Sequence, residues 1–284
     1  MKTFKQINEK ASGSLMIVDA LNLGFRYAHA KTKNFSEDYI RTVESLRKSY
    51  KCDKVVIAGD WGSSSYRKAL SPMYKQNRKD KFAEQTEQEK EDFEAFFAEM
   101  QIVYAKYADE NRYPVLRFQG VEADDIAAFI CSKRKIYNLN HIWLISSDRD
   151  WLLNLAEGVS QFSYVTRKEF TVDNWSEYYD HSIEDYISIK VLQGDSGDNV
   201  PGVPGIGPKK ALQLVREYGS AYDIIANMPI PSKYKYIQNL NDFGAEALLL
   251  NYKLMDLVTN CEEAIGVNNC AIIDDKLKEY LNES

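Results

Sequence analysis

The sequence lacks any long apolar run. Its 284 residues are 44% hydrophobic, enough for a substantial buried core. A helix that spans a bilayer needs about 18 or more consecutive apolar residues, and no such stretch is present. The first 14 residues are polar and lack the apolar centre of a signal peptide. We therefore expect a globular cytoplasmic protein with no membrane partner.

Cysteine is also scarce, and its four positions are Cys52, Cys131, Cys261 and Cys270. No C-x-x-C pair occurs, so the spacing indicates neither a zinc site nor a disulfide framework. We expect reduced thiols in the core.

Positive charge is in short supply as well, since 36 Lys and Arg against 42 Asp and Glu give a formal charge of -6. Nucleic-acid-binding proteins usually carry a basic face, so this balance argues at first against such a partner. The distribution of the acids changes that reading.

Acidic residues follow four apolar runs, at 14–18, 54–58, 113–118 and 141–146. Apolar strands that alternate with helical segments predict an α/β fold with a mainly parallel central sheet flanked by helices. The carboxyl ends of parallel strands share one edge, where ligands of such sheets bind. The acids that should meet there are Asp19, Asp60, Glu122, Asp124, Asp125, Asp148 and Asp150. Acids in a first helical turn also stabilise the helix alone, so Glu122 to Asp125 taken by themselves leave both readings open.

The periodicity predicts further elements. We expect helices over 38–50, 84–107, 183–193, 245–257 and 274–281, and a β-hairpin over 159–172 at the sheet edge. Ser182 suits the N-cap of the third helix. The aromatic stripe of the second is typical of a core-facing surface.

A basic segment with interleaved tyrosines, 66–81, lies between the second and third runs. Lys and Arg runs are commonly solvated, yet this one should lie beside the acids, where it could clamp a polyanion.

The most specific stretch is G-D-S-G-D-N-V-P-G-V-P-G-I-G-P-K-K, residues 194–210. Pro208 suits the first position of a helix that Gly219 would end. Close backbone approach at glycines and N–H groups at a helix start favour a phosphodiester anchor, although glycine and proline clusters also simply make turns. Lys233 and Lys235 either meet phosphate or form a solvated face.

With Asp195 and Asp198 the candidate acids number nine, and the rest of the chain then carries +3 instead of -6. Such hard oxygen ligands favour Mg²⁺ or Mn²⁺. In an extended segment Asp148 and Asp150 would point to one side. On an ideal helix Glu122 and Asp125 lie about 60° apart and Asp124 about 100° from Asp125, which suits two ions better than one.

In this order the motifs I-V-D-A-x-N, G-D, Y-R…Y-K-x-N-R, G-V-E-A-D-D, S-S-D-R-D and G-D-S-G-D-N-x-x-G-V-x-G-I-G resemble the 5′ nuclease superfamily over about residues 15–257. The nearest likeness is to the stand-alone flap endonucleases of bacteriophages, which are similar to the 5′-nuclease domain of bacterial DNA polymerase I. The resemblance implies a PIN-like nuclease core over 1–180 with a helical arch at about 62–112. A helix-three-turn-helix DNA-binding module and C-terminal helices would occupy 181–284.

The resemblance also implies a metal-dependent nuclease. It would cut branched DNA near the junction of a 5′ single-stranded flap, with 5′-3′ exonuclease activity, leaving 5′-phosphate and 3′-hydroxyl ends. Two Mg²⁺, replaceable by Mn²⁺, would be held mainly by Asp19, Asp60, Glu122 and Asp124 for one ion and by Asp125, Asp148, Asp150, Asp195 and Asp198 for the other. Asp148 and Asp150 would also be catalytic.

In the family's pattern Lys75 and Arg78 neutralise the scissile phosphate and Tyr74 stacks on a base. Further DNA contacts would come from Lys190, Gly202, Gly205, Ile206, Gly207, Lys209 and Lys210, with K⁺ at this turn. The implied protein is a monomer that serves a replication polymerase, in the bacterial host cytoplasm if a phage encodes it.

Two other functions remain open. One is a structure-specific DNA-binding protein of the same fold that no longer cuts, which the complete acidic set disfavours. The other is a metal-dependent phosphatase for small esters, in which the anchor and the basic segment would have no role.

Overall fold

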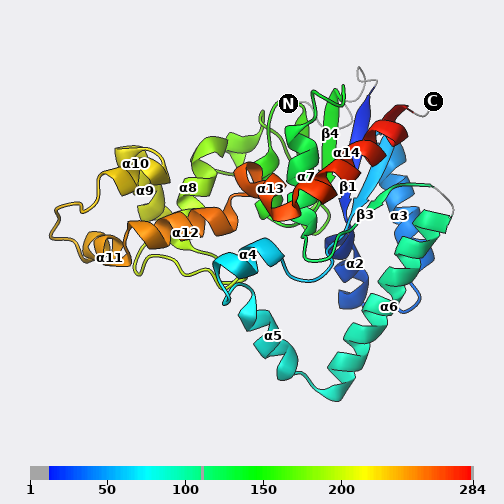
Figure 1. Ribbon diagram of the computed structural model, residues 1–284, viewed down its shortest axis with the longest axis horizontal. Helices are drawn as coiled ribbons and strands as arrows, with labels where there is room; N and C mark the ends of the chain where they lie inside the picture. Colours follow the sequence, from blue (N-terminus) through cyan, green and yellow to red (C-terminus); the bar gives the residue numbers. More distant parts are fainter. Residues whose placement is uncertain (1–12, 110–111, 283–284) are drawn as a thin grey trace. The chain divides into compact units, whose positions relative to one another are not determined.

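The computed structural model describes residues 13–109 and 112–282 (Figure 1). Within them the chain forms two compact units that interleave along the sequence. The first comprises the described parts of Met1–Tyr66, Glu84–Asn174 and Leu257–Ser284, and the second comprises Arg67–Ala83 and Trp175–Asp256. We expected one domain boundary, at residue 180, whereas each of these units contains more than one segment of the chain. The boundary at residue 180 stays a prediction.

The first unit is built on a six-stranded sheet with the order β3-β2-β1-β4-β5-β6. The strands are β1 (Ser14–Asp19), β2 (Lys54–Ala58), β3 (Val115–Leu116), β4 (His141–Ile145), β5 (Val159–Ser163) and β6 (Lys168–Phe170). All neighbours pair in parallel except β5 and β6, which form the expected antiparallel hairpin at the edge. The predicted α/β fold with a mainly parallel sheet is confirmed.

Alternate residues of the buried strands face opposite layers of helices. Met16 and Val18 of β1 join a core with α2 (Ala20–His29), α3 (Ser36–Ser49) and α6 (Glu87–Asp109). Leu15 and Ile17 join another with α7 (Ala123–Ser132), α13 (Leu257–Ile265) and α14 (Val267–Asn282). In the aromatic stripe of α6, Phe96, Tyr104 and Tyr107 are buried in the first core and Phe97 packs against it, as the spacing predicted.

Two local expectations for this unit were wrong. α14 begins at Val267, seven residues before the expected start. The sequence pattern missed its first turns because Val267 and Ile272 are exposed, and only Ile273 and Leu277 are buried along the helix. Asp148 and Asp150 do not lie in an extended segment, because Asp150 opens the 3-10 helix η2 (Asp150–Asn154).

The second unit is helical and has a core of its own. Its helices are α5 (Gln76–Ala83), α8 (Ile183–Gln193), α9 (Pro208–Tyr218), α10 (Ala221–Ala226), α11 (Lys235–Phe243) and α12 (Ala245–Met255), with the short 3-10 helix η3 (Trp175–Glu177). The helix α4 (Ser65–Leu70) crosses the boundary between the units along the chain. The Ser182 hydroxyl caps α8, Pro208 opens α9 and Gly219 ends it, as predicted.

No helix in the described part of the chain is long and apolar enough to cross a membrane. The four cysteines are free thiols, of which Cys52 and Cys261 are buried.

Candidate active site

Seven of the nine candidate acids lie at or just beyond the carboxyl edge of the sheet in the first unit. The register pairs Asp19, the last residue of β1, with Ala58, the last residue of β2. It also pairs Val18 with Ile145, the last residue of β4. Asp60 and Asp148 therefore follow their strands on the same side as Asp19.

Asp19 is held in place by both neighbouring elements. Its Oδ1 accepts the backbone N–H of Asn22 at 3.1 Å, which caps α2, and its Oδ2 accepts the Ser146 hydroxyl at 2.7 Å. The side chain is only 5% exposed. Burial, then the charge of Asp60, raises the pKa of Asp19 to about 8. A carboxylate kept here needs a nearby cation to favour its charged form.

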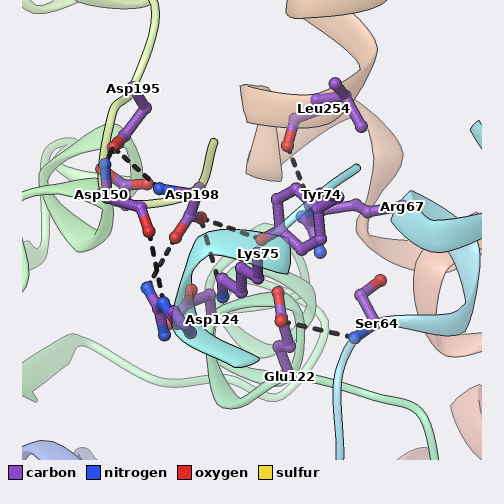
Figure 2. Close-up of polar contacts among 12 residues, drawn as sticks. Ser64, Arg67, Tyr74, Lys75, Glu122, Asp124, Asp150, Asp195, Asp198 and Leu254 are labelled. Carbon is purple, nitrogen blue, oxygen red and sulfur yellow. Dashed lines mark hydrogen bonds and ion pairs between the residues drawn. The ribbon is translucent and has the colours of Figure 1, made fainter. Parts of the chain in front are cut away.

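The start of α7 ties Asp60 and Glu122 together. Asp60 Oδ1 accepts the backbone N–H of Ala123 at 2.8 Å. Glu122 is the N-cap residue, with an extended backbone, and its buried side chain accepts the N–H of Ser64 at 3.3 Å (Figure 2). Glu122 is thus outside the helix, so the ideal helical angle expected between it and Asp125 does not apply.

Asp124 and Asp125 lie in the first turn of α7 and have different surroundings. Asp124 Oδ1 accepts the indole N–H of Trp151 at 2.6 Å, and the Trp151 side chain is fully buried. Asp125 is itself fully buried. Burial of the Cys261 thiol on α13 raises its pKa to about 11, and the negative charge of Asp125 is the second cause of this rise.

The loop that carries Asp148 and Asp150 is fixed by residues that sequence reasoning missed as site residues. The amide of Gln161 on β5, itself buried, donates to the carbonyls of Ser146 at 2.9 Å and of Asp148 at 2.8 Å. Ser146 Oγ accepts the N–H of Asp148 at 3.1 Å while it donates to Asp19. Asp148 Oδ1 accepts the N–H of Asp150 at 2.9 Å, which turns the chain into η2.

Asn22 completes this frame, since its Oδ1 accepts the N–H of Ser147 at 2.8 Å. Asn22 and Ser146 stand within the motifs I-V-D-A-x-N and S-S-D-R-D, so a signal existed for both. Gln161 and Trp151 carried none.

The donor chemistry of this edge fits a divalent cation. Its candidate ligands are carboxylate oxygens, which Mg²⁺ and Mn²⁺ prefer. The leading causes of the Asp19 pKa shift include two further carboxylates, Asp60 and Asp148, and no cationic side chain. Among residues 13–109 and 112–282 no three His, Cys, Asp or Glu side chains lie close enough together to hold a metal ion as they stand. Like charges repel without a cation, and Mg²⁺ keeps several waters, so a closed protein cage is not required.

The second unit holds Asp195 and Asp198 in a loop that binds the basic segment. Asp198 accepts the Tyr74 hydroxyl at 2.9 Å and Arg78 Nη2 at 2.6 Å, and Lys75 Nζ lies 3.6 Å from it (Figure 2). Asp195 Oδ2 lies 3.5 Å from Lys190 Nζ. These contacts therefore involve six of the predicted site residues.

The backbone joins the same two segments, because Lys75 N–H donates to the Asp198 carbonyl at 2.8 Å. The Tyr74 ring is only 3% exposed and belongs to the core of the second unit. The expectation that this ring stacks on a base therefore needs correction. Its hydroxyl orients Asp198 instead, and the buried ring presents no open face.

The glycines of the predicted anchor serve different purposes. A Cβ at Gly202 would lie 1.8 Å from the Gln193 carbonyl, so backbone packing requires glycine there. Gly205 has a φ of +80°, which glycine adopts without strain. At Gly207 a Cβ would meet no described atom within 4 Å. Gly202 and Gly205 are therefore explained by the backbone turn alone. Gly207 has open space around it, which leaves room for a ligand to approach the backbone closely.

The other residues of the predicted anchor are partly buried in the core and partly exposed. Ile206 is buried in the core of the second unit, whereas Lys209 and Lys210 are exposed at the start of α9.

Family models match two stretches of the chain: 5′-3′ exonuclease, N-terminal resolvase-like domain, over residues 14–180, and 5′-3′ exonuclease, C-terminal SAM fold, over residues 182–277. The chain belongs to the 5′-3′ exonuclease family. It is 42% identical to the flap endonuclease of Escherichia phage T5 over 94% of this chain and 91% of that protein.

Solved structures of this family share the fold. One is a pseudo-enzyme–product complex of the bacteriophage T5 flap endonuclease with DNA and metal ions, which matches with a TM-score of 0.89 at 39% identity over 95% of this chain and 100% of that one. Another is the T5 5′-exonuclease with bound divalent zinc ions, with a TM-score of 0.89 at 40% identity and the same coverage. The family resemblance drawn from the motifs is confirmed.

Proposed function

We propose that this protein is a divalent-metal-dependent, structure-specific 5′ nuclease that hydrolyses phosphodiesters near 5′-flap/duplex junctions of branched DNA, with 5′-3′ exonuclease activity. The observation that carries the proposal is the set of carboxylates at the carboxyl edge of the sheet, with Asp19 and Glu122 buried there. It stands in a chain that aligns along nearly its full length with a flap endonuclease.

The metal would be Mg²⁺, with Mn²⁺ as a substitute, and a pair of such ions held by these carboxylates would supply activation of a water and stabilisation of the attacking and leaving oxygens. Asp19, Asp60, Glu122 and Asp124 would serve mainly one ion. Asp125, Asp148, Asp150, Asp195 and Asp198 would serve mainly the other. The Ser146 hydroxyl and the Asn22 backbone N–H donate to Asp19, and the Trp151 indole donates to Asp124, which keeps these side chains oriented and lowers the cost of arranging like charges.

Lys75 and Arg78 would neutralise the scissile phosphate. Both now pair with Asp198, so their cationic groups are already held at a carboxylate. In the hydrolysis the water oxygen joins phosphorus and the bond to O3′ breaks, which leaves 5′-phosphate and 3′-hydroxyl ends. The turn with Gly205, Gly207 and Lys209 would hold duplex phosphates, with K⁺ bound at the turn.

A labelled 5′-flap substrate tests this function. We expect Mg²⁺-dependent cleavage mapped to the junction, and loss of cleavage without loss of DNA binding in Asp148→Asn and Asp150→Asn. An intact flap in the presence of Mg²⁺ would contradict the proposal, and so would full activity of the two variants. DNA binding without cleavage by the wild-type protein would instead point to the non-catalytic relative.

We further propose that the protein acts as a monomer in the host cytoplasm and serves a replication polymerase in flap or primer removal. The flap endonuclease relative in a phage supports this setting. A phosphatase for small esters would be inhibited little by DNA. Measuring whether DNA inhibits hydrolysis of a small phosphate ester would therefore distinguish a phosphatase from a nuclease.

A further inference from the structure

Trp61 differs from the other three tryptophans of the chain in being exposed. The side chains of Trp143 and Trp151 are fully buried and that of Trp175 is 4% exposed, whereas that of Trp61 is 52% exposed. Tryptophan is highly buried on average. Among the described side chains of the first unit, those that form its two cores do not include the Trp61 indole. Packing in the core therefore does not account for this ring.

The backbone places Trp61 directly beside two candidate metal ligands. Trp61 follows Asp60 in the chain. Its N–H donates to the Val121 carbonyl at 3.3 Å, and its carbonyl accepts the N–H of Gly120 at 2.7 Å. The next residue along that segment is Glu122. The backbone of Trp61 is therefore held between Asp60 and Glu122 without any contribution from the indole.

The guanidinium of Arg117 covers one side of the indole. Its Cζ lies 5.6 Å from the centre of the Trp61 ring and 4.1 Å from the centre of the Tyr104 ring. Arg117 Nε donates to the Asp60 carbonyl at 3.3 Å, and Nη1 donates to Gln101 Oε1 at 3.2 Å. These contacts fix Arg117, so it supports the indole from one face. The other face is left for a planar group from solution.

We propose that the Trp61 indole stacks on an unpaired base of the 5′ single-stranded flap, next to the scissile phosphate. The proposal rests on the proposed nuclease function and adds a base contact to the carboxylate edge. An aromatic side chain stacks on any base, so this contact requires no particular sequence. An unpaired base fits better than a paired one, because a base inside a duplex must first leave its own stack.

An abasic nucleotide tests this contact. Flap DNA is bound in EDTA, so that nothing is cut, and fluorescence anisotropy gives Kd. The flap nucleotides nearest the junction are made abasic one at a time, and one of these changes should weaken binding on the order of tenfold, as expected for one base–aromatic stack. Trp61→Ala should lose a similar factor with the unmodified flap and lose no more with the abasic one. Trp61→Phe should lose less, because it keeps an aromatic face.

Tryptophan emission gives a second measurement that needs no cleavage. Because the other three indoles are buried, a change in emission on binding reports chiefly on Trp61. Flap DNA in EDTA should quench the emission of the wild type, and Trp61→Phe should abolish the quenching. The matched control is Tyr222→Ala, which removes a ring of nearly the same exposure, 51%, from the second unit. This control should leave the flap affinity and the quenching unchanged.

Independent losses from Trp61→Ala and from every abasic flap would overturn the stacking contact. Unchanged emission of the wild type at saturating flap DNA would also overturn it. The nuclease function is tested separately by adding Mg²⁺. A wild-type protein that is quenched by the flap and leaves it uncut would refute the nuclease function and support the stacking contact, whereas cleavage without quenching would do the reverse.

Discussion

Trp151→Phe isolates one hydrogen bond to a candidate metal ligand. The indole N–H donates to Asp124 Oδ1 at 2.6 Å, and the Trp151 side chain is fully buried. Phenylalanine keeps most of the ring volume and removes the donor. Hydrogen bonds to charged groups contribute about 1.5–3 kcal/mol, and loss of a residue that orients a metal ligand weakens metal binding about 10–100-fold. We expect a shift of this size in the Mg²⁺ concentration that gives half-maximal cleavage.

Two measurements separate orientation from folding. Isothermal calorimetry reports metal binding without DNA, and urea unfolding in EDTA reports stability. Trp175→Phe is the matched control, because its buried indole also donates at 2.6 Å, to the His181 carbonyl in the second unit. It should lose stability with little change in metal affinity. If Trp151→Phe kept the wild-type metal affinity despite lower stability, the bond would be structural and the reasoning refuted.

Three further outcomes follow from the same contacts. Lys75→Ala should slow single-turnover cleavage greatly and weaken DNA binding only modestly, and equal losses in both would count against a role at the reacting phosphate. Gly202→Ala should unfold the second unit in a thermal melt, because its Cβ would meet the Gln193 carbonyl, whereas Gly207→Ala should melt normally and bind duplex more weakly. Burial lowers the pKa of His141 from 6.5 to about 4, so the neutral form stabilises the fold above pH 6.5 and that stability, up to about 3 kcal/mol, is lost as pH falls toward 4. Urea unfolding of His141→Phe at pH 7 and pH 4.5 should show a smaller pH effect than the wild type.

The sequence was informative where a residue's own chemistry or periodicity defines its place. Apolar runs such as 14–18 predicted the parallel strands of the sheet. Asp19, directly after that run, predicted carboxylates at the carboxyl edge of the sheet. α14 was placed too late because its first turns bury little, so they carry no clear period. Gln161 and Trp151 could not be found from sequence, because a glutamine or tryptophan shows its role only through the partner that folding brings to it.

The turn at Asp148 was missed for a related reason. An Asp two residues before another predicts side chains on one side only if the backbone is extended. Here the Asp148 carboxylate accepts the Asp150 N–H and bends the chain into η2. Local side-chain acceptors compete with extended structure, and the alternation rule does not include that competition.

The same competition explains how three carboxylates can stand within four residues at the start of α7. Two such charges about 4 Å apart would repel by roughly 4 kcal/mol at an effective dielectric near 20. Glu122 stays outside the helix and accepts the Ser64 N–H, while Asp124 accepts the Trp151 indole. Asp125 is buried, and its negative charge contributes to the raised pKa of the Cys261 thiol on α13. Each acid therefore has a different neighbour, which separates the charges and makes it physically reasonable for Glu122 and Asp125 to serve different ions.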